Sequence, residues 1–287
     1  MPGGQSGDKA EIARFLKKRE KRPNYDAQKD LFIALFDRKL VGYLDLFSEP
    51  GIARTILDCF VLPQHRRCGL GNELINRGLH RSVQLRAQVA HVKITEDNFA
   101  AEKFLSELGF AEVHCFLELE ADLVEVFKKE TGQVSHYTET FKTGEEACLA
   151  DIQARVFSGS WGFSPNTADE IKYYLDLTNS ELEDILVLRI DSKIAGYSWA
   201  HELLSGRPDV ELKRYRIHMF GIDPPYRRKG LGKKLLWAQL NQLRNTRAKS
   251  IELTVDDKNL AACSLYFSAG FKKKSKSLWY EKRLDKL

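Results

Sequence analysis

The chain has 287 residues, of which 43% are hydrophobic and 30% charged, and its formal net charge at pH 7 is +5. These values are typical of an ordinary soluble globular protein, and the length fits two domains of about 140 residues better than one. No apolar stretch approaches the roughly 18 residues that span a bilayer, and residues 1–8 lack an apolar core, so we expect neither a membrane partner nor a secretory signal.

Cysteine usage and charge distribution exclude further classes of protein. The five cysteines are odd in number and form no Cys-x-x-Cys pair, so we expect no disulfide framework, no metal site, and a reducing, cytoplasmic location. The positive balance mildly favours anionic ligands. The basic run Lys17–Arg22 is interrupted by Glu20 and contains no aromatic residue, which favours a solvated helix face over nucleic-acid binding.

The first half of the chain predicts a helix within 9–21 and then a hairpin within 30–43, where two apolar runs flank a polar turn. A β-rich stretch from Thr55 ends at Pro63. It is followed by a basic turn with the sequence Gln64-His-Arg-Arg-Cys-Gly-Leu-Gly71, which leads into a helical pattern.

The second half repeats these elements. A hairpin is predicted within 184–197, a strand over 215–224, a turn with the sequence Pro225-Tyr-Arg-Arg-Lys-Gly-Leu-Gly232, and then an amphipathic helix. The hairpins align at an offset of 154 residues and the turns at 161, so the second copy has a longer loop, which we place near 205–209. We therefore predict two domains, 1–130 and 131–287.

The two copies differ at their front ends. About 50 residues of the second copy precede Asp184, whereas only 29 residues precede Asp30. A strand and two helices do not fit into the shorter segment, so we expect the first copy to be truncated and to lack its first strand.

Each basic turn has the features of a phosphate site. Main-chain N–H groups at a helix N-terminus have no intrahelical partner and lie at the positive end of the helix dipole, which favours an anion. Glycines let the backbone approach a phosphate closely. A plain strand–turn–helix connection is the alternative, but two copies in the same context favour phosphate binding. The turn is neither a P-loop nor a Rossmann fingerprint.

The second copy carries two motifs of a known family. Residues 220–236, with their Arg-x-x-Gly-x-Gly turn, resemble motif A of the GNAT acetyltransferases, and residues 251–271 resemble motif B. The resemblance covers nearly all of 134–287 and about 30–120. It implies two tandem GNAT domains of the α/β (α+β) class, each a mixed, mostly antiparallel sheet flanked by helices. The tandem layout is similar to that of the mycothiol synthase-like acetyltransferases.

The resemblance further implies acetyl-CoA as the cofactor and a set of residues that bind it. In the second copy these are Phe220, Gly221, Ile222, Arg227, Arg228, Lys229, Gly230, Leu231, Gly232, Lys233, Asn259, Ala262 and Tyr266. In the first copy they are Val61, Arg66, Arg67, Gly69 and Gly71, although the sequence leaves open whether this copy still binds coenzyme A.

Acetyl transfer to an amine needs a neutral amine, N–H donors for the tetrahedral oxyanion, and a proton for the leaving thiolate. In the GNAT family a Tyr seven residues after the motif B Asn usually supplies that proton, which implies Tyr266 as the acid. A core aromatic is the alternative. The first copy has Leu105 at this position, which cannot donate a proton, so we expect the second copy to be catalytic.

The general base is left open between His218 and Glu202, with His201 also nearby. Many family members have a Glu six residues before Ile222, but this chain has Arg216 there. Strand alternation predicts that His218 lies on the face of Ile222, where a buried structural histidine is the alternative.

The acceptor pocket is predicted in front of the second copy. Trp161 and Phe163 lie in a Gly-containing loop, and Thr167 with Glu170 forms a capping box that opens a helix. We expect both aromatic residues to line the acceptor site, with plain packing as the alternative.

Together these features predict an enzyme that transfers acetyl from acetyl-CoA directly to the primary amine of a small molecule or a peptide. The alternative is a non-catalytic, coenzyme A-binding regulatory protein, which Arg216 and the degenerate first copy favour. Tyr266 and the acceptor loop favour the enzyme. The sequence identifies neither the acceptor nor the oligomeric state.

Overall fold

The computed structural model describes residues 22–129, 138–178, 184–203, 213–244 and 246–285. These residues form two compact units, one that comprises 116–275 and one that comprises 22–115 and 276–285. The helix predicted within 9–21 and the loop near 205–209 lie outside the described residues.

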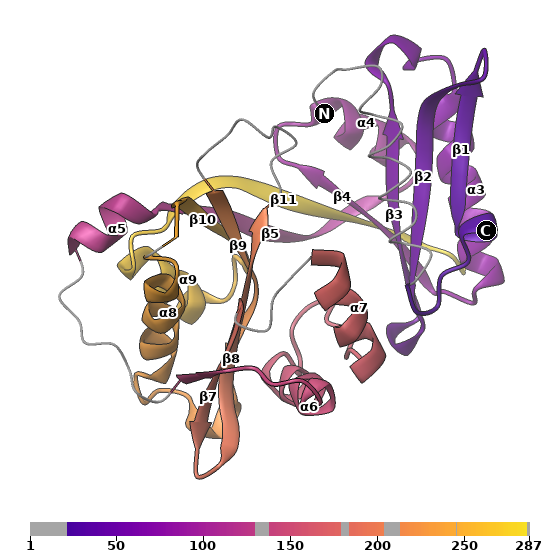
Figure 1. The fold of residues 1–287 in the computed structure, drawn as a ribbon. Helices are drawn as coiled ribbons and strands as arrows, with labels where there is room; N and C mark the ends of the chain where they lie inside the picture. Colours follow the sequence, from indigo (N-terminus) through magenta and orange to yellow (C-terminus); the bar gives the residue numbers. More distant parts are fainter. Residues whose placement is uncertain (1–21, 130–137, 179–183, 204–212, 245, 286–287) are drawn as a thin grey trace. The chain divides into compact units, whose positions relative to one another are not determined.

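The unit of residues 22–115 and 276–285 is a sheet with helices on one face (Figure 1). Its elements are α2 (Ala27–Asp30), β1 (Leu31–Phe36), β2 (Lys39–Glu49), β3 (Arg54–Val61), α3 (Leu70–Gln84), β4 (Val89–Thr95), α4 (Phe99–Glu107), the first part of β5 (Ala111–Asp122) and the last part of β11 (Lys272–Arg283). Leu74, Ile75 and Leu79 of α3 pack on Leu44 and Leu57 of the sheet. The strand order is β1-β2-β3-β4-β11, with β3 and β4 parallel.

The unit of residues 116–275 has a larger set of helices. Its elements are the rest of β5, α5 (Leu123–Lys129), β6 (Thr138–Thr140), α6 (Glu146–Val156), α7 (Ala168–Thr178), β7 (Ile185–Ile190), β8 (Lys193–Leu203), β9 (Lys213–Ile222), α8 (Leu231–Gln242), β10 (Ala248–Asp256), α9 (Leu260–Ser268) and the first part of β11. The strand order is β5-β10-β9-β8-β7-β6, and β9 and β10 are parallel.

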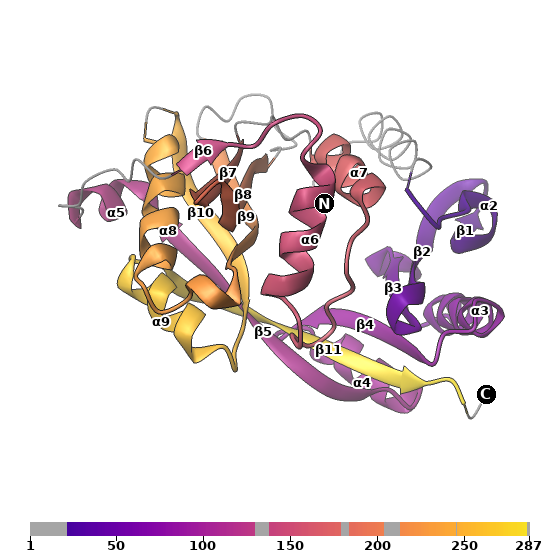
Figure 2. The same ribbon diagram turned by 90° about the horizontal axis from the view of Figure 1, so that it is seen from below.

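Helices cover both faces of this second sheet. Alternate residues of β9 and β10, such as Ile217 and Leu253, pack against α8 and α9. Tyr197 and Trp199 of β8 point to the other face, where Ile152 of α6 packs on them. Figures 1 and 2 show α8 and α9 on one side of β8, β9 and β10, and α6 and α7 on the other. The face covered by α6 and α7 is called the α6/α7 face below.

The last strand of each sequence copy belongs to the other unit. Residues 116–122 of β5, which end the first copy, pair with β10. Residues 277–283 of β11, which end the second copy, pair with β4. Each sheet is therefore completed by the other copy, an exchange that sequence periodicity does not reveal.

The structure confirms the prediction of a mixed, mostly antiparallel sheet flanked by helices, and both predicted hairpins form. Their turns have the same positive φ angles, at Asp37 and Arg38 in one and at Asp191 and Ser192 in the other. In the described part of the chain no helix has the length and apolar character needed to cross a bilayer. Because residues 1–21 are not described, the truncation of the first copy stays a prediction.

Candidate active site

The basic turn before α8 has the geometry expected of an anion site. Arg228 and Gly230 have positive φ angles of 62° and 75°, and Gly230 is the N-cap of α8. No other atom lies within 4 Å of a Cβ built on Gly230, so the space above the turn is open. Residues 227–230 are exposed, and the turn leads directly into the N-terminus of α8, where main-chain N–H groups lack intrahelical partners.

The first copy builds the same turn before α3. Arg67 and Gly69 have φ angles of 64° and 87°, and Gly69 is the N-cap. A short 3-10 turn precedes each site, over Pro63–His65 and Pro224–Tyr226. The duplication seen in the sequence is therefore a duplication of backbone conformation.

The first arginine of each turn shapes the backbone. Arg227 donates from Nε to the carbonyl of Ile222 at 2.9 Å and from Nη2 to that of Val156 at 2.7 Å. Arg66 donates from Nε to the carbonyl of Val61 at 2.8 Å. The guanidinium groups that the sequence assigns to the anion thus hold the turn onto the preceding strand.

The end of α6 packs directly over β9. A Cβ on Gly221 would lie 2.1 Å from Cγ1 of Val156, so only glycine permits this approach. The first copy has Phe60 at the aligned position. The packing of α6 on β9 is therefore sufficient to require glycine at position 221, without any contact to a cofactor.

A β-bulge interrupts β9 at His218. Trp199 pairs with Met219, but the next residue, Ala200, pairs with Ile217, so no residue lies opposite His218. The corresponding strands of the first copy, β2 and β3, pair without interruption from Gly42 to Glu49. His218 is thus one of the seven residues by which the offset between the copies grows, and the predicted loop accounts for only the others.

The bulge corrects the predicted orientation of His218. Phe220 and Ile222 pack on the side of α8, whereas the ring of His218 meets Trp199 at 5.1 Å and Tyr174 of α7 at 5.7 Å between centroids. Simple alternation was wrong here because an inserted residue reverses the faces on its two sides. His218 lies on the α6/α7 face and is exposed, unlike a buried structural histidine.

Two imidazoles meet on this face. His201 and His218 lie 5.9 Å apart between ring centroids. Closely packed protein atoms lower the pKa of His218, and the neighbouring His201 and Arg216 lower it further. His201 is only 8% exposed, and burial followed by the charge of Arg216 lowers its pKa to about 4. Both rings are therefore neutral at pH 7, and a neutral imidazole can accept a proton.

The other candidate base has a different environment. Ala200 packs in the core on the side of α8, so alternation places Glu202 on that side, away from the face of His201. The carboxylate of Glu202 accepts a hydrogen bond from Nζ of Lys213 at 2.7 Å. The structure brings His218 and His201 together, and it does not bring Glu202 to them.

Arg216, which stands where the family often has a Glu, forms part of a charged row. It donates from Nε to Glu252 and from Nη2 to Glu118, each at 3.0 Å. Burial opposes ionisation of Glu252, but Arg216 and Lys274 outweigh it and lower the pKa of this carboxyl group. No local sequence pattern indicates that Glu118 belongs to this site, because it comes from the first copy.

Tyr266 lies within the core of α9, β9 and β10. It is 5% exposed, and its ring meets those of Phe220 at 5.9 Å and Phe271 at 5.7 Å. Burial, with a smaller contribution from Cys263, raises the pKa of its phenol. The hydroxyl is therefore protonated at pH 7.

Asn259 has a structural role that sequence reasoning missed. Its side chain accepts a hydrogen bond from the main-chain N–H of Ala262 at 3.1 Å and so caps α9. Asn98 caps α4 through Ala101 in the same way. An Asn immediately before an apolar helix was the available signal.

The strands beside Tyr266 separate at their ends. Parallel pairing of β9 with β10 ends at Ile217 and Leu253, short of the turn that leads to α8. In the first copy it ends at Ile56 and His91. In both copies the strand that leads to the basic turn therefore keeps its antiparallel partner but has no parallel partner over its last residues.

The two aromatic residues of the predicted acceptor loop have different ring contacts. Trp161 lies 6.0 Å from Phe116 of β5 between ring centroids, whereas Phe163 packs on Phe157 of its own loop at 5.3 Å. The capping box forms: Thr167 N donates to Glu170 at 2.8 Å and Glu170 N donates back to the Thr167 hydroxyl at 3.2 Å.

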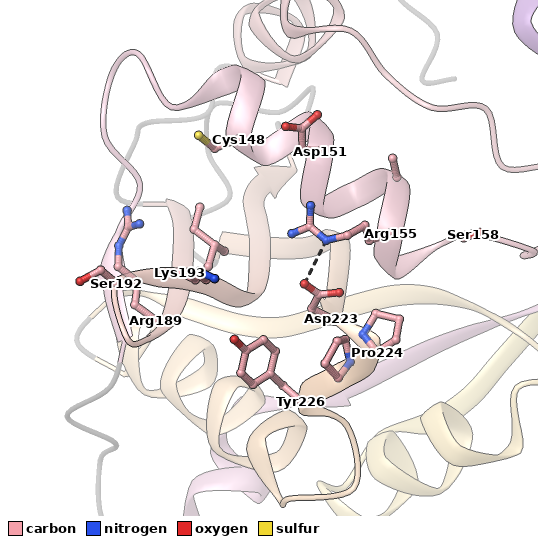
Figure 3. Close-up of a pocket in the computed structure, with 13 residues that line it drawn as sticks. Cys148, Asp151, Arg155, Ser158, Arg189, Ser192, Lys193, Asp223, Pro224 and Tyr226 are labelled. Atoms are coloured by element: carbon pink, nitrogen blue, oxygen red, sulfur yellow. Dashed lines mark hydrogen bonds and ion pairs between the residues drawn. The ribbon is translucent and has the colours of Figure 1, made fainter.

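An open groove of about 1010 Å³ lies beside the turn, between α6 and the β7–β8 hairpin (Figure 3). None of the predicted catalytic or acceptor residues lines it. Arg155 of α6 donates to the carboxylate of Asp223 at 3.0 Å across its floor. The pair ties α6 to the start of the turn. Within the described ranges, no group of three metal-binding side chains occurs.

Comparisons with known proteins give the family. The model of the "Acetyltransferase (GNAT) family" matches residues 7–110 and again 148–271. The chain is 25% identical over 249 residues to mycothiol acetyltransferase of Acidothermus cellulolyticus, covering 82% of this chain and 73% of the relative. It is 28% identical over 266 residues to mycothiol acetyltransferase of Salinispora arenicola, covering 88% and 81%.

Solved structures share the fold. A tandem GNAT protein from the clavulanic acid biosynthesis pathway has a TM-score of 0.70 at 12% identity and covers 94% of this chain and 87% of its own. A GCN5-related N-acetyltransferase from Sphaerobacter thermophilus has a TM-score of 0.66 at 18% identity, with 95% and 85% covered. With two family matches on a duplicated turn and sheet, the chain belongs to the GNAT acetyltransferase family as a tandem-domain N-acetyltransferase.

Proposed function

We propose that the second copy transfers acetyl from acetyl-CoA directly to the primary amine of a small molecule or a peptide. The observation that best supports this proposal is the bulge at His218, which the first copy lacks. His218 lies in the same unit as Tyr266 and the turn at Gly230. The combination of a base, an acid and an anion site in one unit supports acetyl-CoA-dependent chemistry there.

The main-chain N–H groups of the turn before α8 bind the pyrophosphate of the donor, with Arg228 and Lys229 adding charge. Residues Phe220 to Ile222 of β9, which pair with β8 but not with β10, bind the extended arm. The remaining donor contacts are assigned to Leu231, Gly232, Lys233, Asn259 and Ala262. Arg227 supports the turn from behind, through its bonds to Ile222 and Val156.

The reaction forms a C–N bond and breaks the C–S bond of the thioester. His218 accepts the proton that the amine loses, and we prefer it to Glu202, which is paired with Lys213. The phenol of Tyr266 donates its proton to the departing thiolate and regains one from solvent. A bulge takes main-chain N–H groups out of the ladder, and such donors suit the tetrahedral oxyanion.

The first copy keeps the anion site and loses the chemistry. Val61, Arg66, Arg67, Gly69 and Gly71 occupy a turn of the same conformation. Leu105 replaces the acid, and β3 has no bulge beside it. We assign it coenzyme A binding without turnover.

The acceptor is not carried over from the relatives. Their name, mycothiol acetyltransferase, makes a mycothiol precursor one amine to test. The paired Arg216 at the position of the family's Glu, however, argues against the same acceptor. Trp161 lines the acceptor side, and Phe163 supports the loop through Phe157.

The test is thiol release from acetyl-CoA with a panel of primary amines: a mycothiol precursor, glucosamine, ethylamine, 2-phenylethylamine and a lysine-containing peptide. Mass spectrometry then identifies the acetylated product. Thiol release matched by N-acetylated product supports the proposal. Tight acetyl-CoA binding without release for any amine supports the regulatory alternative instead.

A further inference from the structure

The strand that ends the first copy forms part of the α6/α7 face in the unit that holds Tyr266. Leu117, Leu119 and Ala121 of β5 pack into the core beneath α8 and α9. Because strand residues alternate, Phe116, Glu118 and Glu120 point to the opposite face. That is the face on which His218 and Trp161 lie, and residues 116–122 belong to this unit.

The register places Glu118 and Phe116 beside the bulge. Arg216 pairs with Glu252, which pairs with Glu120 on the next strand. Two residues further along β10, Thr254 pairs with Glu118, at the level where β9 reaches His218. Phe116 lies one step further, opposite Asp256, past the point where β9 and β10 separate.

Contacts fix this strand to both sides of the face. Glu118 accepts hydrogen bonds from Arg216 at 3.0 Å and from the hydroxyl of Thr254 at 2.8 Å. The ring of Phe116 meets that of Trp161 at a centroid distance of 6.0 Å and an angle of 58°. Both rings are only half-buried, so each keeps surface for a ligand.

The other unit does not repeat this arrangement. There β11 takes the place of β5, and Glu281 opposite His91 corresponds to Glu120 opposite Glu252. By this register Ser277 stands where Phe116 stands, so the aromatic residue is particular to the strand that serves the second copy.

We propose that the first copy completes the acceptor site of the second, and that Phe116 together with Trp161 selects an amine that carries an apolar group. This inference rests on the proposed transferase function and adds its substrate class. It gives the degenerate first copy a part in acceptor selection by the second, because β5 supplies one wall of the site.

The experiment compares 2-phenylethylamine with ethylamine as acceptors, measured as thiol release from acetyl-CoA by the full chain. Wild-type protein is expected to prefer 2-phenylethylamine in kcat/KM by about tenfold, and Phe116→Ala to abolish most of this preference. The kcat/KM for ethylamine and the KM for acetyl-CoA stay within about twofold, since small acceptors and the donor do not need the wall. Phe36→Ala, an exposed residue of β1, is the matched control and keeps the preference.

Trp161→Ala removes the other ring of the pair and leaves every residue of the sheet unchanged. It should cause the same loss of preference, which guards against misfolding of the strand variant. A wild-type enzyme with no preference, or a Phe116→Ala variant that keeps it, overturns the proposal while leaving the transferase function intact. Absence of thiol release from wild-type protein with every amine of the panel refutes the function, and the proposal falls with it.

Discussion

The ring of His218 stands edge-on to that of Trp199, with 5.1 Å between centroids and an angle of 76° between planes. The first copy has Asp45 in the place of Trp199 and no residue in the place of His218, because β2 and β3 pair without a bulge. One inserted residue thus distinguishes two otherwise similar strands, and it puts an imidazole on the face where the acceptor is expected.

Replacing His218 by Ala is expected to lower kcat by about a hundredfold, as typical for loss of a general base, and to leave acetyl-CoA affinity unchanged. Steady-state kinetics with the best amine, together with calorimetric titration of coenzyme A, check both parts. Glu202→Gln is the control, since its partner is Lys213, and it should retain activity. The reverse pattern would make Glu202 the base.

The pH dependence of kcat/KM tests the environment of His218. Its pKa lies below the usual value of about 6.5, so the base is unprotonated at pH 7 and activity falls only at more acidic pH. Arg216→Met removes a neighbouring positive charge, which should raise the pKa of His218 and move the acid limb to higher pH. Arg216→Lys keeps the charge and should leave the limb nearly in place. If the acid limb of the pH profile does not move in Arg216→Met, the limb reports the titration of a group other than His218.

Much of this site follows from sequence, and the failures have physical causes. The turn at Gly230 could be predicted because glycines and cations before a helix are a local sequence pattern. The same pattern occurs before α3, where Gly69 also has a positive φ angle. The sheet face on which His218 lies was predicted wrongly, because alternation of side chains assumes continuous strand pairing. No residue type in the sequence indicates the β-bulge. The presence of Glu118 and Phe116 at this site could not be predicted, because the periodicity of a short segment does not show which distant strand it pairs with.

Tyr266→Phe is expected to slow turnover by about a hundredfold with little change in acetyl-CoA affinity. The phenol is protonated at pH 7 because burial raises its pKa, so its loss removes a proton donor and little volume. Steady-state kinetics at pH 7 with saturating acetyl-CoA check this. If Tyr266→Phe turns over at the wild-type rate, Tyr266 is a core aromatic residue and not the acid.

The exchanged strand predicts an effect of the first copy on the stability of the second unit. Leu119 is fully buried against α8 and α9, although it belongs to the first copy in sequence. Leu119→Ala should cost about 2–5 kcal/mol of unfolding free energy. It should also speed amide exchange in β10, which pairs with this strand. Val113→Ala, an exposed position of the same strand, is the control. Exchange in β10 that stays at the wild-type rate in Leu119→Ala would mean that the strand does not support this sheet.

Gly230→Asp tests the anion site itself. At a φ angle of 75° an Asp side chain strains the backbone, and its carboxylate repels a phosphate from the N-terminus of α8. We expect the variant to lose both acetyl transfer and one coenzyme A site in calorimetric titration. Gly69→Asp makes the same change before α3 and should remove the other coenzyme A site while sparing transfer, because the first copy lacks the acid and the bulge. If Gly230→Asp keeps its affinity, the pyrophosphate does not bind at this turn; if Gly69→Asp stops transfer, the first copy has a role in the chemistry beyond its strand.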